Sequence, residues 1–379
     1  MKELDLSGLS DRQLAGRILE SIRSRLERLQ RPIRLMEVCG THTVNISRHG
    51  LRQLLPPHLH LLSGPGCPVC VTDQKDIDLI MELARERDVI VTTYGDMMRV
   101  PGSRTTLQEE KAAGCDVRVV YSPLDALAVA RENPQRKVIF YAVGFETTAP
   151  MAAASLELAV KQGLRNFFML SVHKTVPPAL EALLTARDVA LDGFILPGHV
   201  STVIGAAAYE PLVRKYRVPS VIAGFEPVDV LRAVDMLLAQ LEEGRAEVEI
   251  EYERVVTREG NRAAQEVIAE YFVPCDSVWR GIGKIPGSGL ELQPRWAEYN
   301  ARVQFAVEDL LARLPEPPPL TKACSCGEVL KGAKLPPECP LFGRVCTPAA
   351  PVGPCMVSSE GSCAAYYRYE RREREVAAR

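Results

Sequence analysis

Residues 138–162, VIFYAVGFETTAPMAAASLELAVKQ, contain the unit from which much of this chain is built. Residues 138–143 form a short apolar run, rich in β-branched and aromatic side chains, which is typical of a buried strand. A glycine and several polar residues follow at 144–148, and residues 149–162 then show the composition of a helix that covers a sheet. A buried strand followed by a helix is the repeating unit of a parallel α/β sheet.

The same alternation continues outward from this unit, from about residue 31 to residue 225. The predicted strands are 33–38, 59–63, 89–93 and 117–121, followed by 138–143, 167–172, 193–196 and 220–223. Helical patterns lie between them, for example at 77–87, 149–162, 178–187 and 203–216. We therefore predict an α/β fold with two Rossmann-like parallel-sheet domains, residues 33–135 and 136–226, that face one cleft.

The two ends of the chain differ from this pattern. Residues 1–32 predict a charged amphipathic N-terminal helix, which we expect to pack on a C-terminal domain spanning residues 227–379. That domain begins with a predicted helix at 228–243, a strand at 248–256 and a helix at 261–271, followed by chain rich in glycine and proline. The PEPPP stretch within residues 314–320 predicts a stiff linker. Beyond it the content of cysteine, proline and glycine is too high for an ordinary core, so we expect a metal centre to order the segment.

Composition restricts the compartment and the partners. The chain has 379 residues, 46% of them hydrophobic, a net charge of −2 and 11 cysteines. We predict a cytoplasmic protein, because the N-terminus does not resemble a signal peptide and no apolar run is long enough to cross a membrane. No basic stripe predicts nucleic acid as a partner, and no phosphate-binding glycine motif predicts a nucleotide. Clustered cysteines in a reducing compartment indicate metal or redox chemistry.

The strongest chemical signal is a group of cysteines between residues 324 and 363. Four of them follow the spacing Cys324-x14-Cys339-x6-Cys346-x16-Cys363. Intervals of this length can wrap one compact centre, and thiolates are the usual ligands of iron–sulfur clusters. The alternative is a four-cysteine zinc site, for which paired Cys-x2-Cys motifs are expected and are absent. Cys326 and Cys355 are left over, and either could replace one of the four.

A second signal is the stretch Gly64-Pro-Gly-Cys-Pro-Val-Cys70, located between a predicted strand and a predicted helix. A Cys-x2-Cys pair at the start of a helix is the arrangement that permits reversible disulfide formation. Cys67 and Cys70 are therefore candidates for a redox pair. The alternatives are half of a metal site or two packed cysteines, and spacing does not separate them.

Cys39 stands where the strand predicted at 33–38 ends, in the motif Cys39-Gly-Thr-His42-Thr. Ligands of open α/β sheets bind at the carboxyl ends of the strands, so Cys39 is expected at the mouth of the cleft. We also expect N–H groups of the following helix to favour its thiolate form. The alternative for Cys39 is that it is simply a small buried side chain, as a lone cysteine more often is. His42, three residues further on, is a candidate proton donor or hydrogen-bonding partner.

Other polar motifs also follow predicted strands. Glu146, His173 and His199 each occupy such a position, and their convergence on one cleft would suit proton or thiol chemistry. Taken singly, each is as well explained by a cap or a turn. Cys115 and Cys275 lie outside every motif and are expected to be packed rather than functional.

These motifs together resemble the HypD family, the maturation factors of [NiFe] hydrogenases. The stretches that carry the resemblance are MEVCGTHT, LLSGPGCPVCVT, YGDMMRVPGS, VGFETTAP, LPGHVS, AGFEPVD, WRGIGKIPGSGL and CPLFGRVCTPAAPVGPCMVSSEGSCAAYYRY. They extend from residue 36 to residue 369, nearly the whole chain. Asp73 stands where the family's pattern leads us to expect proline, which affects no proposed ligand.

The resemblance implies an assembly scaffold rather than a conventional turnover enzyme. On such a scaffold an iron atom acquires two cyanides and one carbonyl, giving Fe(CN)2CO, which then passes to the hydrogenase large subunit. By resemblance, Cys39 holds this iron together with a cysteine of a small HypC-type partner, and a HypE-type partner supplies cyanide. The resemblance also implies that Cys67 and Cys70 form a thiol–disulfide switch.

For the C-terminal cysteines, the resemblance implies a [4Fe-4S] cluster held by Cys324, Cys339, Cys346 and Cys363. Two alternatives to the scaffold remain. One is a ferredoxin-linked thiol–disulfide oxidoreductase that uses the cluster and the Cys67 and Cys70 pair as successive carriers. The other is a zinc-stabilised interaction module with no redox role.

Overall fold

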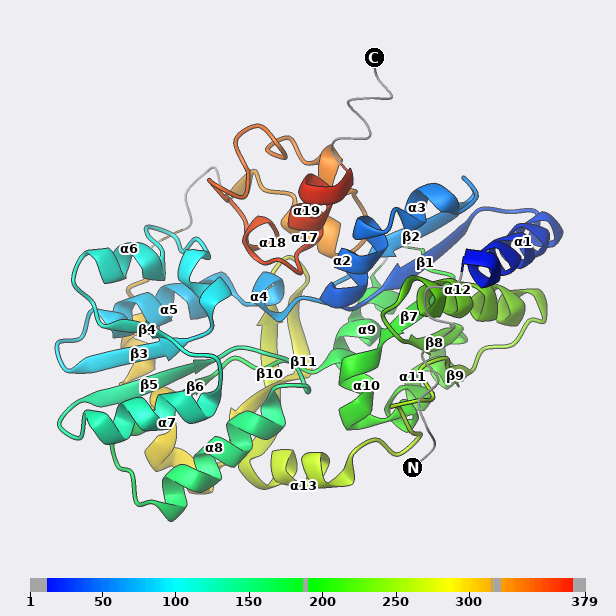
Figure 1. The fold of residues 1–379 in the computed structure, drawn as a ribbon. Coiled ribbons are helices and arrows are strands. Elements are labelled where there is room, and N and C mark those ends of the chain that lie inside the picture. Colours follow the sequence, from blue (N-terminus) through cyan, green and yellow to red (C-terminus); the bar gives the residue numbers. More distant parts are fainter. Residues whose placement is uncertain (1–11, 187–189, 315, 317–321, 371–379) are drawn as a thin grey trace.

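In a computed structural model, which describes residues 12–186, 190–314, 316 and 322–370, two parallel β-sheets stand side by side (Figure 1). Sheet A has the strand order β2-β1-β7-β8-β9, and sheet B has the order β4-β3-β5-β6. All neighbouring strands within these two sheets run parallel. The predicted α/β class, with parallel sheets, is therefore confirmed.

The predicted strands are present, with ends shifted by a few residues. Sheet A contains β1 (Ile33–Glu37), β2 (Leu59–Ser63), β7 (Gly193–Pro197), β8 (Ser220–Ala223) and β9 (Val248–Ile250). Sheet B contains β3 (Val89–Thr93), β4 (Val117–Val119), β5 (Lys137–Ala142) and β6 (Phe167–Ser171). β4 and β9 are clearly shorter than predicted, and both are edge strands, where pairing is available on one side only.

The order in which the chain fills the two sheets differs from the prediction. β1 and β2 belong to sheet A, the next four strands form sheet B, and the chain returns to sheet A with β7. The prediction of two successive four-strand units is therefore wrong in its grouping of strands. The predicted boundary between residues 135 and 136 falls between β4 and β5, within the sequence that forms sheet B. The strand pattern contains no signal for this return, because pairing depends on neighbours in space.

Helices connect the parallel strands and cover the sheets. Those in the sheet region are α2 (Gly40–Arg48), α3 (Leu51–Leu54), α4 (Pro68–Val71), α5 (Gln74–Ala84), η1 (Gly95–Arg99), α6 (Leu107–Ala112), α7 (Pro123–Glu132), α8 (Ala149–Lys161), α9 (Val176–Thr185), α10 (Gly198–Ile204), η2 (Ala206–Tyr209) and α11 (Glu210–Tyr216). The predicted helix 203–216 is broken at Gly205, whose φ of +77° disfavours any other residue.

The N-terminal helix α1 (Arg12–Leu29) packs along α12 (Pro227–Glu242) (Figure 1). The Ser21 hydroxyl and the Arg25 guanidinium both donate to Asp235, at 2.7 and 3.0 Å. α12 begins the predicted region 227–379, but it packs against β7 and β8 and so belongs to the layer that covers sheet A. Residues 1–11 of the predicted N-terminal helix lie outside the described residues.

An antiparallel hairpin was not predicted. After α13 (Arg262–Tyr271), strands β10 (Phe272–Trp279) and β11 (Gly283–Leu292) pair in the stretch for which the sequence indicated only chain rich in glycine and proline. The buried Trp279 donates to the Ser288 hydroxyl at 2.9 Å and stacks on Phe145 with ring centroids 5.8 Å apart. The hairpin thereby packs against the loop that follows β5 of sheet B. The predicted linker at 314–320 lies, apart from residues 314 and 316, outside the described residues.

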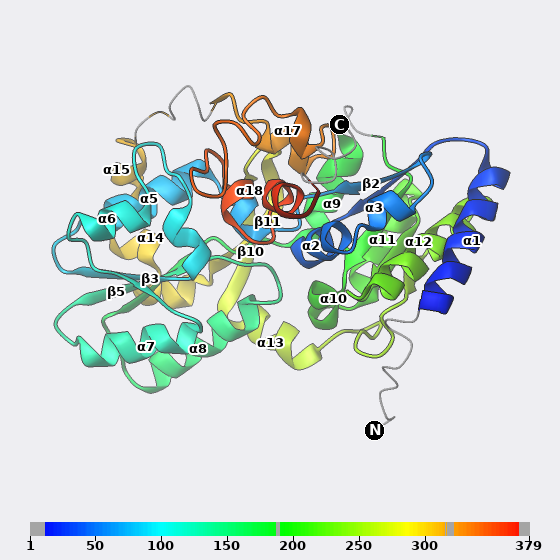
Figure 2. The same ribbon diagram turned by 45° about the horizontal axis from the view of Figure 1, so that its top comes forward.

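The cysteine-rich segment lies above the junction of the two sheets (Figures 1 and 2). Its short elements, with those that precede it, are η3 (Pro294–Tyr299), α14 (Ala301–Gln304), α15 (Val307–Leu311), α17 (Cys326–Leu330), η4 (Pro336–Glu338), α18 (Pro354–Val357), α19 (Ser362–Ala365) and η5 (Tyr366–Glu370). α18 packs on α4 and α19 on α2. Five of its cysteines share a buried cluster with Met36, Leu62 and Trp279, so the segment packs on the sheets through an apolar interface.

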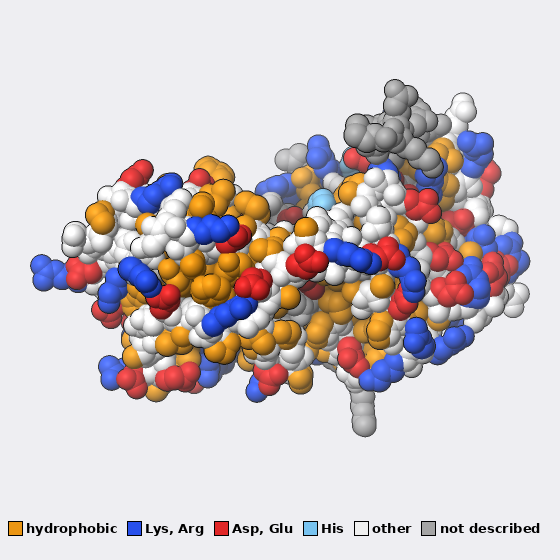
Figure 3. Space-filling model, turned by 90° about the horizontal axis from the view of Figure 1, so that it is seen from below, with side chains coloured by type: hydrophobic (Ala, Val, Ile, Leu, Met, Phe, Trp, Pro, Cys, Tyr) orange, Lys and Arg blue, Asp and Glu red, His pale blue; other side chains and the backbone are white. Residues whose placement is uncertain are grey.

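Within the described part of the chain, the helices are all too short or too polar to cross a bilayer. On the face drawn in Figure 3, basic and acidic side chains alternate over the surface without forming a broad area of one charge.

Candidate functional site

A cavity of about 500 Å3 lies where the carboxyl ends of strands from both sheets meet. Sheet A contributes Cys39 after β1, Gly66 after β2 and His199 after β7, and sheet B contributes Tyr94 after β3 and Thr148 after β5. Ligands of open parallel sheets bind at this end of the strands. We call this space the Cys39 cavity. Cys39 lies in its wall at the carboxyl end of a parallel strand, which is where the sequence predicted it.

Cys39 caps the N-terminus of α2 and is 8% exposed. Burial raises the pKa of its thiol to about 12, and the charges of Glu360 and Glu37 add to this effect. Backbone N–H groups of His42 and Thr41 oppose it by donating hydrogen bonds. The expectation that these N–H groups favour the thiolate is therefore outweighed by desolvation. A metal ion that binds this sulfur has to displace a proton.

The backbone of Cys39 is held rigidly on both sides. Glu37 accepts a hydrogen bond from the Cys39 N–H at 3.0 Å and another from the Thr43 hydroxyl at 2.6 Å. Gly66 packs so closely that a Cβ there would lie 2.2 Å from the Cys39 nitrogen. Any larger residue at Gly66 would push Cys39 out of place. These contacts fix the backbone from which the sulfur projects.

Phe225, which follows β8, contacts two histidines: His199, which lines the cavity, and His42, which is not among its described lining residues. The Phe225 ring lies 3.9 Å from the His199 ring, nearly parallel, and 4.9 Å from the His42 ring. His42 also forms a 2.8 Å hydrogen bond from Nε2 to the Gly224 carbonyl, which requires a proton on Nε2. Its Nδ1 then carries a lone pair, is buried and has no hydrogen-bond partner among the described residues. Burial lowers the pKa of His42 to about 4, so the ring is neutral.

Replacing Phe225 with alanine is expected to raise the pKa of His199. His199 is exposed on one side, and partial desolvation lowers its pKa in the intact protein; loss of the stacked ring would expose the other face of the imidazole to water. NMR titration of histidine ring protons measures the change. Tyr252→Leu is the matched control, because Tyr252 contacts Phe225 edge-on at 5.7 Å. An unchanged His199 titration in Phe225→Ala would show that the stack does not set the protonation of His199.

Glu146 and His173 lie apart from the cavity, whose described lining residues include His199 but neither of these two. Glu146 accepts a hydrogen bond from the Val176 N–H at 2.8 Å, so it caps α9, while its second oxygen is buried without a partner among the described residues. Burial raises the pKa of Glu146 to about 7. His173 is hydrogen-bonded to the Ser171 hydroxyl at 3.2 Å, and burial lowers the pKa of its ring to about 4. The His173 ring is therefore neutral at pH 7, and the Glu146 carboxylate is easily protonated.

Glu360 lines the Cys39 cavity and was not anticipated from the sequence. Its carboxylate accepts a hydrogen bond from the Thr41 hydroxyl at 3.0 Å, and a Cβ at Gly40 would lie 2.5 Å from the Glu360 Cβ. Burial raises the pKa of Glu360, and nearby Asp96 contributes. Glu360 comes from the cysteine-rich segment, so this segment forms part of the cavity wall. Its position in a loop between cysteines gave no sequence signal.

Cys67 and Cys70 occupy the short helix α4, which carries the chain from sheet A toward sheet B. Their sulfur atoms are 2.7 Å apart, and the Cys67 sulfur accepts a hydrogen bond from the Cys70 N–H. Both residues are buried. Desolvation and the bonds to neighbouring thiols raise the pKa of Cys70. The two sulfurs therefore face one another, as a reversible disulfide requires.

The Cys67 and Cys70 pair is in contact with the C-terminal cysteines through Cys355. The sulfur of Cys355 is hydrogen-bonded to both Cys326 and Cys70, and these bonds lower its pKa. Cys326 in turn contacts Cys363, and its sulfur lies 3.1 Å from that of Cys324. Spacing identified Cys326 and Cys355 only as spare cysteines. The structure places them between the two motifs.

Two of the four predicted cluster ligands, Cys324 and Cys363, are in contact with this group through Cys326. The Val352 N–H donates to the Cys346 sulfur at 3.3 Å, and Cys339 is 8% exposed. Among the described residues, no three side chains of the types that bind metals are arranged as a ready-made coordination group.

The donor set nevertheless fits a cluster with thiolate ligands. The thiols are buried within one segment, and a backbone N–H group already points at the Cys346 sulfur, as is common around iron–sulfur centres. Gly353 leaves room for sulfur, because a Cβ there would lie 2.5 Å from the Cys326 sulfur and 2.7 Å from that of Cys324.

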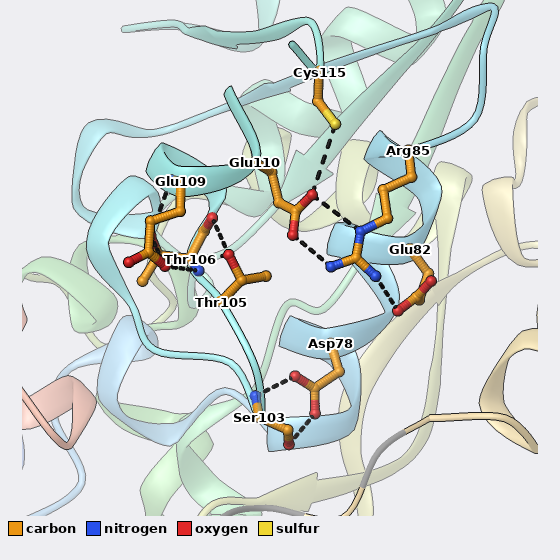
Figure 4. Close-up of polar contacts among 9 residues, drawn as sticks. All are labelled: Asp78, Glu82, Arg85, Ser103, Thr105, Thr106, Glu109, Glu110 and Cys115. Carbon is orange, nitrogen blue, oxygen red and sulfur yellow. Dashed lines mark hydrogen bonds and ion pairs between the residues drawn. The ribbon is translucent and has the colours of Figure 1, made fainter. Parts of the chain in front are cut away.

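Cys115 and Cys275 lie away from this group. Cys115 contacts the Glu110 carboxylate at 3.7 Å, and Glu110 is paired with Arg85, within a surface network of α5 and α6 (Figure 4). Cys275 lies on β10, packed near Gly289. Neither is close to another cysteine in the contacts of the described chain.

These features define a class: a parallel α/β protein whose strand ends and cysteine-rich segment enclose a cavity with Cys39 in its lining. The chain matches the family model HypD, described as the "Hydrogenase formation hypA family", over residues 13–370. It is 47% identical to the hydrogenase maturation factor HypD of Azotobacter vinelandii over 98% of this chain and 97% of that protein. It is 45% identical to HypD of Escherichia coli over 95% and 96% of the two chains. The chain belongs to the HypD family.

Proposed function

We propose that this protein is a scaffold for [NiFe] hydrogenase maturation, on which Fe(CN)2CO is assembled at Cys39. The observation that carries the proposal is the position of Cys39, whose backbone is held by Glu37 and Gly66 at the wall of a cavity between the two sheets. Iron(II) with cyanide and carbonyl ligands suits a soft thiolate donor. The two similar proteins are named as hydrogenase maturation factors, and nearly the full length of each is matched.

The protein's own residues have three tasks in this proposal. Cys39 binds the iron and loses its thiol proton as it does so. His199, on the cavity wall, would be a hydrogen-bonding group for the bound iron's ligands, and neutral His42 would hold the start of α2 against the Gly224 carbonyl. Glu360 and Asp96 add negative charge to the cavity, which favours a cation there.

The proposed partners follow from the family. A HypC-type protein contributes a second thiolate, a HypE-type protein supplies cyanide, and the hydrogenase large subunit receives the product without needing direct contact with Cys39. The cavity is open to the surface, as a second protein's cysteine requires. We keep the cytoplasm as the predicted location, because the thiols have to remain reduced.

We further propose that Cys324, Cys339, Cys346 and Cys363 hold a [4Fe-4S] cluster, which would supply or accept single electrons. The thiols between this group and the Cys39 cavity provide a path for exchange. If Cys67 and Cys70 form a disulfide, thiolate attack by Cys355 on the Cys70 sulfur yields a mixed disulfide and frees Cys67. Attack by Cys326 on Cys355 then frees Cys70 and leaves a Cys326–Cys355 disulfide. Two electrons have then moved from Cys326 and Cys355 to Cys67 and Cys70, whose disulfide is reduced to two thiols.

The alternative is a ferredoxin-linked thiol–disulfide oxidoreductase that turns over a disulfide substrate. The close contact of Cys70 with Cys355 is compatible with it. Infrared spectra of the protein, co-produced anaerobically with its HypC-type partner, separate the two. Cyanide and carbonyl bands support the scaffold, whereas their absence together with catalytic disulfide reduction supports the enzyme. Iron, sulfide and zinc analysis tests the cluster, and a colourless protein loaded with zinc would contradict both readings.

A further inference from the structure

A second cavity, of about 740 Å3, opens between the edge of sheet A and the C-terminal segment. β2 forms one wall, and Gly332, Leu335 and Tyr366 also line the space. We call it the β2 cavity. It is lined by different residues from the Cys39 cavity, and no part of the proposed function uses it.

Arg34 is the unusual residue of the β2 cavity. It lies on β1, and its Nη2 donates to the Gly332 carbonyl at 3.3 Å. Its Nε is buried and has no hydrogen-bond partner among the described residues. An unpaired buried donor is costly, and in native proteins such groups are usually satisfied by water or a ligand. The edge of a guanidinium that carries Nε and Nη2 matches the two oxygens of a carboxylate.

The other charged side chains of the β2 cavity already have partners. Arg52 pairs with Glu370 at 2.6 Å, and Lys334 pairs with Glu328 at 2.6 Å. Glu338 accepts a hydrogen bond from the Leu335 N–H. Arg34 differs from Arg52 and Lys334 in that its guanidinium has no carboxylate partner among the described residues. A ligand with one negative charge is favoured over a phosphate dianion, because Glu338 and Glu370 line the same space.

The exposed edge of β2 does not favour an added peptide strand. The Leu61 carbonyl already accepts a hydrogen bond from Arg52 at 3.0 Å, and the Leu59 N–H donates to the Pro56 carbonyl at 2.9 Å. A strand that added here would meet backbone groups that are no longer available. Pro56 and Leu335 instead offer apolar walls to a small carbon skeleton.

We propose that the β2 cavity binds a small organic carboxylate, with Arg34 holding the carboxylate edge-on and the apolar wall covering its hydrocarbon part. The probe for the test is isovalerate, and its neutral counterpart is isovaleramide. Saturation-transfer NMR on the anaerobically prepared full-length protein is expected to show saturable binding of isovalerate and little binding of the amide. Arg34→Gln should weaken isovalerate binding about tenfold or more, because it removes a charge-assisted pair of hydrogen bonds.

Further variants separate binding from loss of structure. Arg17→Gln, at an exposed position of α1, is the matched control and should bind as the wild type does. Leu335→Trp keeps Arg34 but fills the cavity, and it should also reduce binding. Equal binding of the amide, unchanged binding in Arg34→Gln, or displacement of isovalerate by low concentrations of inorganic phosphate would overturn the proposal. A lack of any saturable isovalerate signal would do the same.

Discussion

Cyanide and carbonyl infrared bands are expected to fall by more than about a hundredfold when Cys39 is replaced with alanine. Even residues that only support a metal ligand typically cost 10 to 100-fold in metal affinity, roughly, when removed. Loss of the thiolate itself leaves no soft donor at this position in the cavity wall. The measurement compares wild type and Cys39→Ala, each co-produced with the HypC-type partner and normalised to protein.

Two controls make this result specific. Cys115→Ser removes a thiol that contacts the Glu110 carboxylate and is not among the described lining residues of the Cys39 cavity, so it should keep the bands unchanged. Cys39→Ala should keep its visible absorption from the proposed cluster, since its sulfur is not among the predicted cluster ligands. Bands of wild-type intensity in Cys39→Ala would place the iron elsewhere and contradict the scaffold at Cys39.

The fold could be predicted locally but not globally from the sequence. β2, β3 and β8 begin and end where the apolar runs do, because a buried strand needs apolar residues on both faces. Strand pairing could not be predicted in this way. β1 pairs with β7, although the two strands are more than 150 residues apart along the chain. The β10–β11 hairpin was missed because its glycines and prolines conceal the buried Trp279 and Ile285.

The site was predictable where motifs follow strands. Cys39 and His199 were expected at strand ends, and both line the cavity. Glu360 could not be found in this way, because it reaches Cys39 from a loop that is distant in sequence. Phe225 belongs to the quoted stretch AGFEPVD, but its contact with two histidines depends on how α2, α10 and the loop after β8 meet in space. The thiol pKa was misjudged because helix N–H groups were weighed without the burial of Cys39.

The contact of Cys355 with Cys70 predicts that these two thiols form a disulfide when Cys67 is removed. In a Cys67→Ser variant, Cys70 has lost its nearest sulfur, which lies 2.7 Å away in the intact protein. Mild oxidation with diamide is then expected to join Cys70 to Cys355 in most molecules, because Cys355 is the other thiol bonded to Cys70. Peptide mass spectrometry after alkylation of the remaining thiols detects this disulfide directly.

The test is which cysteine becomes disulfide-bonded to Cys70 in the Cys67→Ser variant. Adding Cys355→Ser to Cys67→Ser should abolish the cross-link, whereas adding Cys275→Ser should not affect it. A cross-link from Cys70 to Cys363 or Cys346 would contradict the order of contacts in the structure and remove Cys355 from the exchange path. In the Cys67→Ser variant, infrared bands at wild-type intensity would show that the pair is not needed for assembly. A trapped Cys70–Cys355 disulfide together with lost bands would connect the thiol path to the chemistry at Cys39.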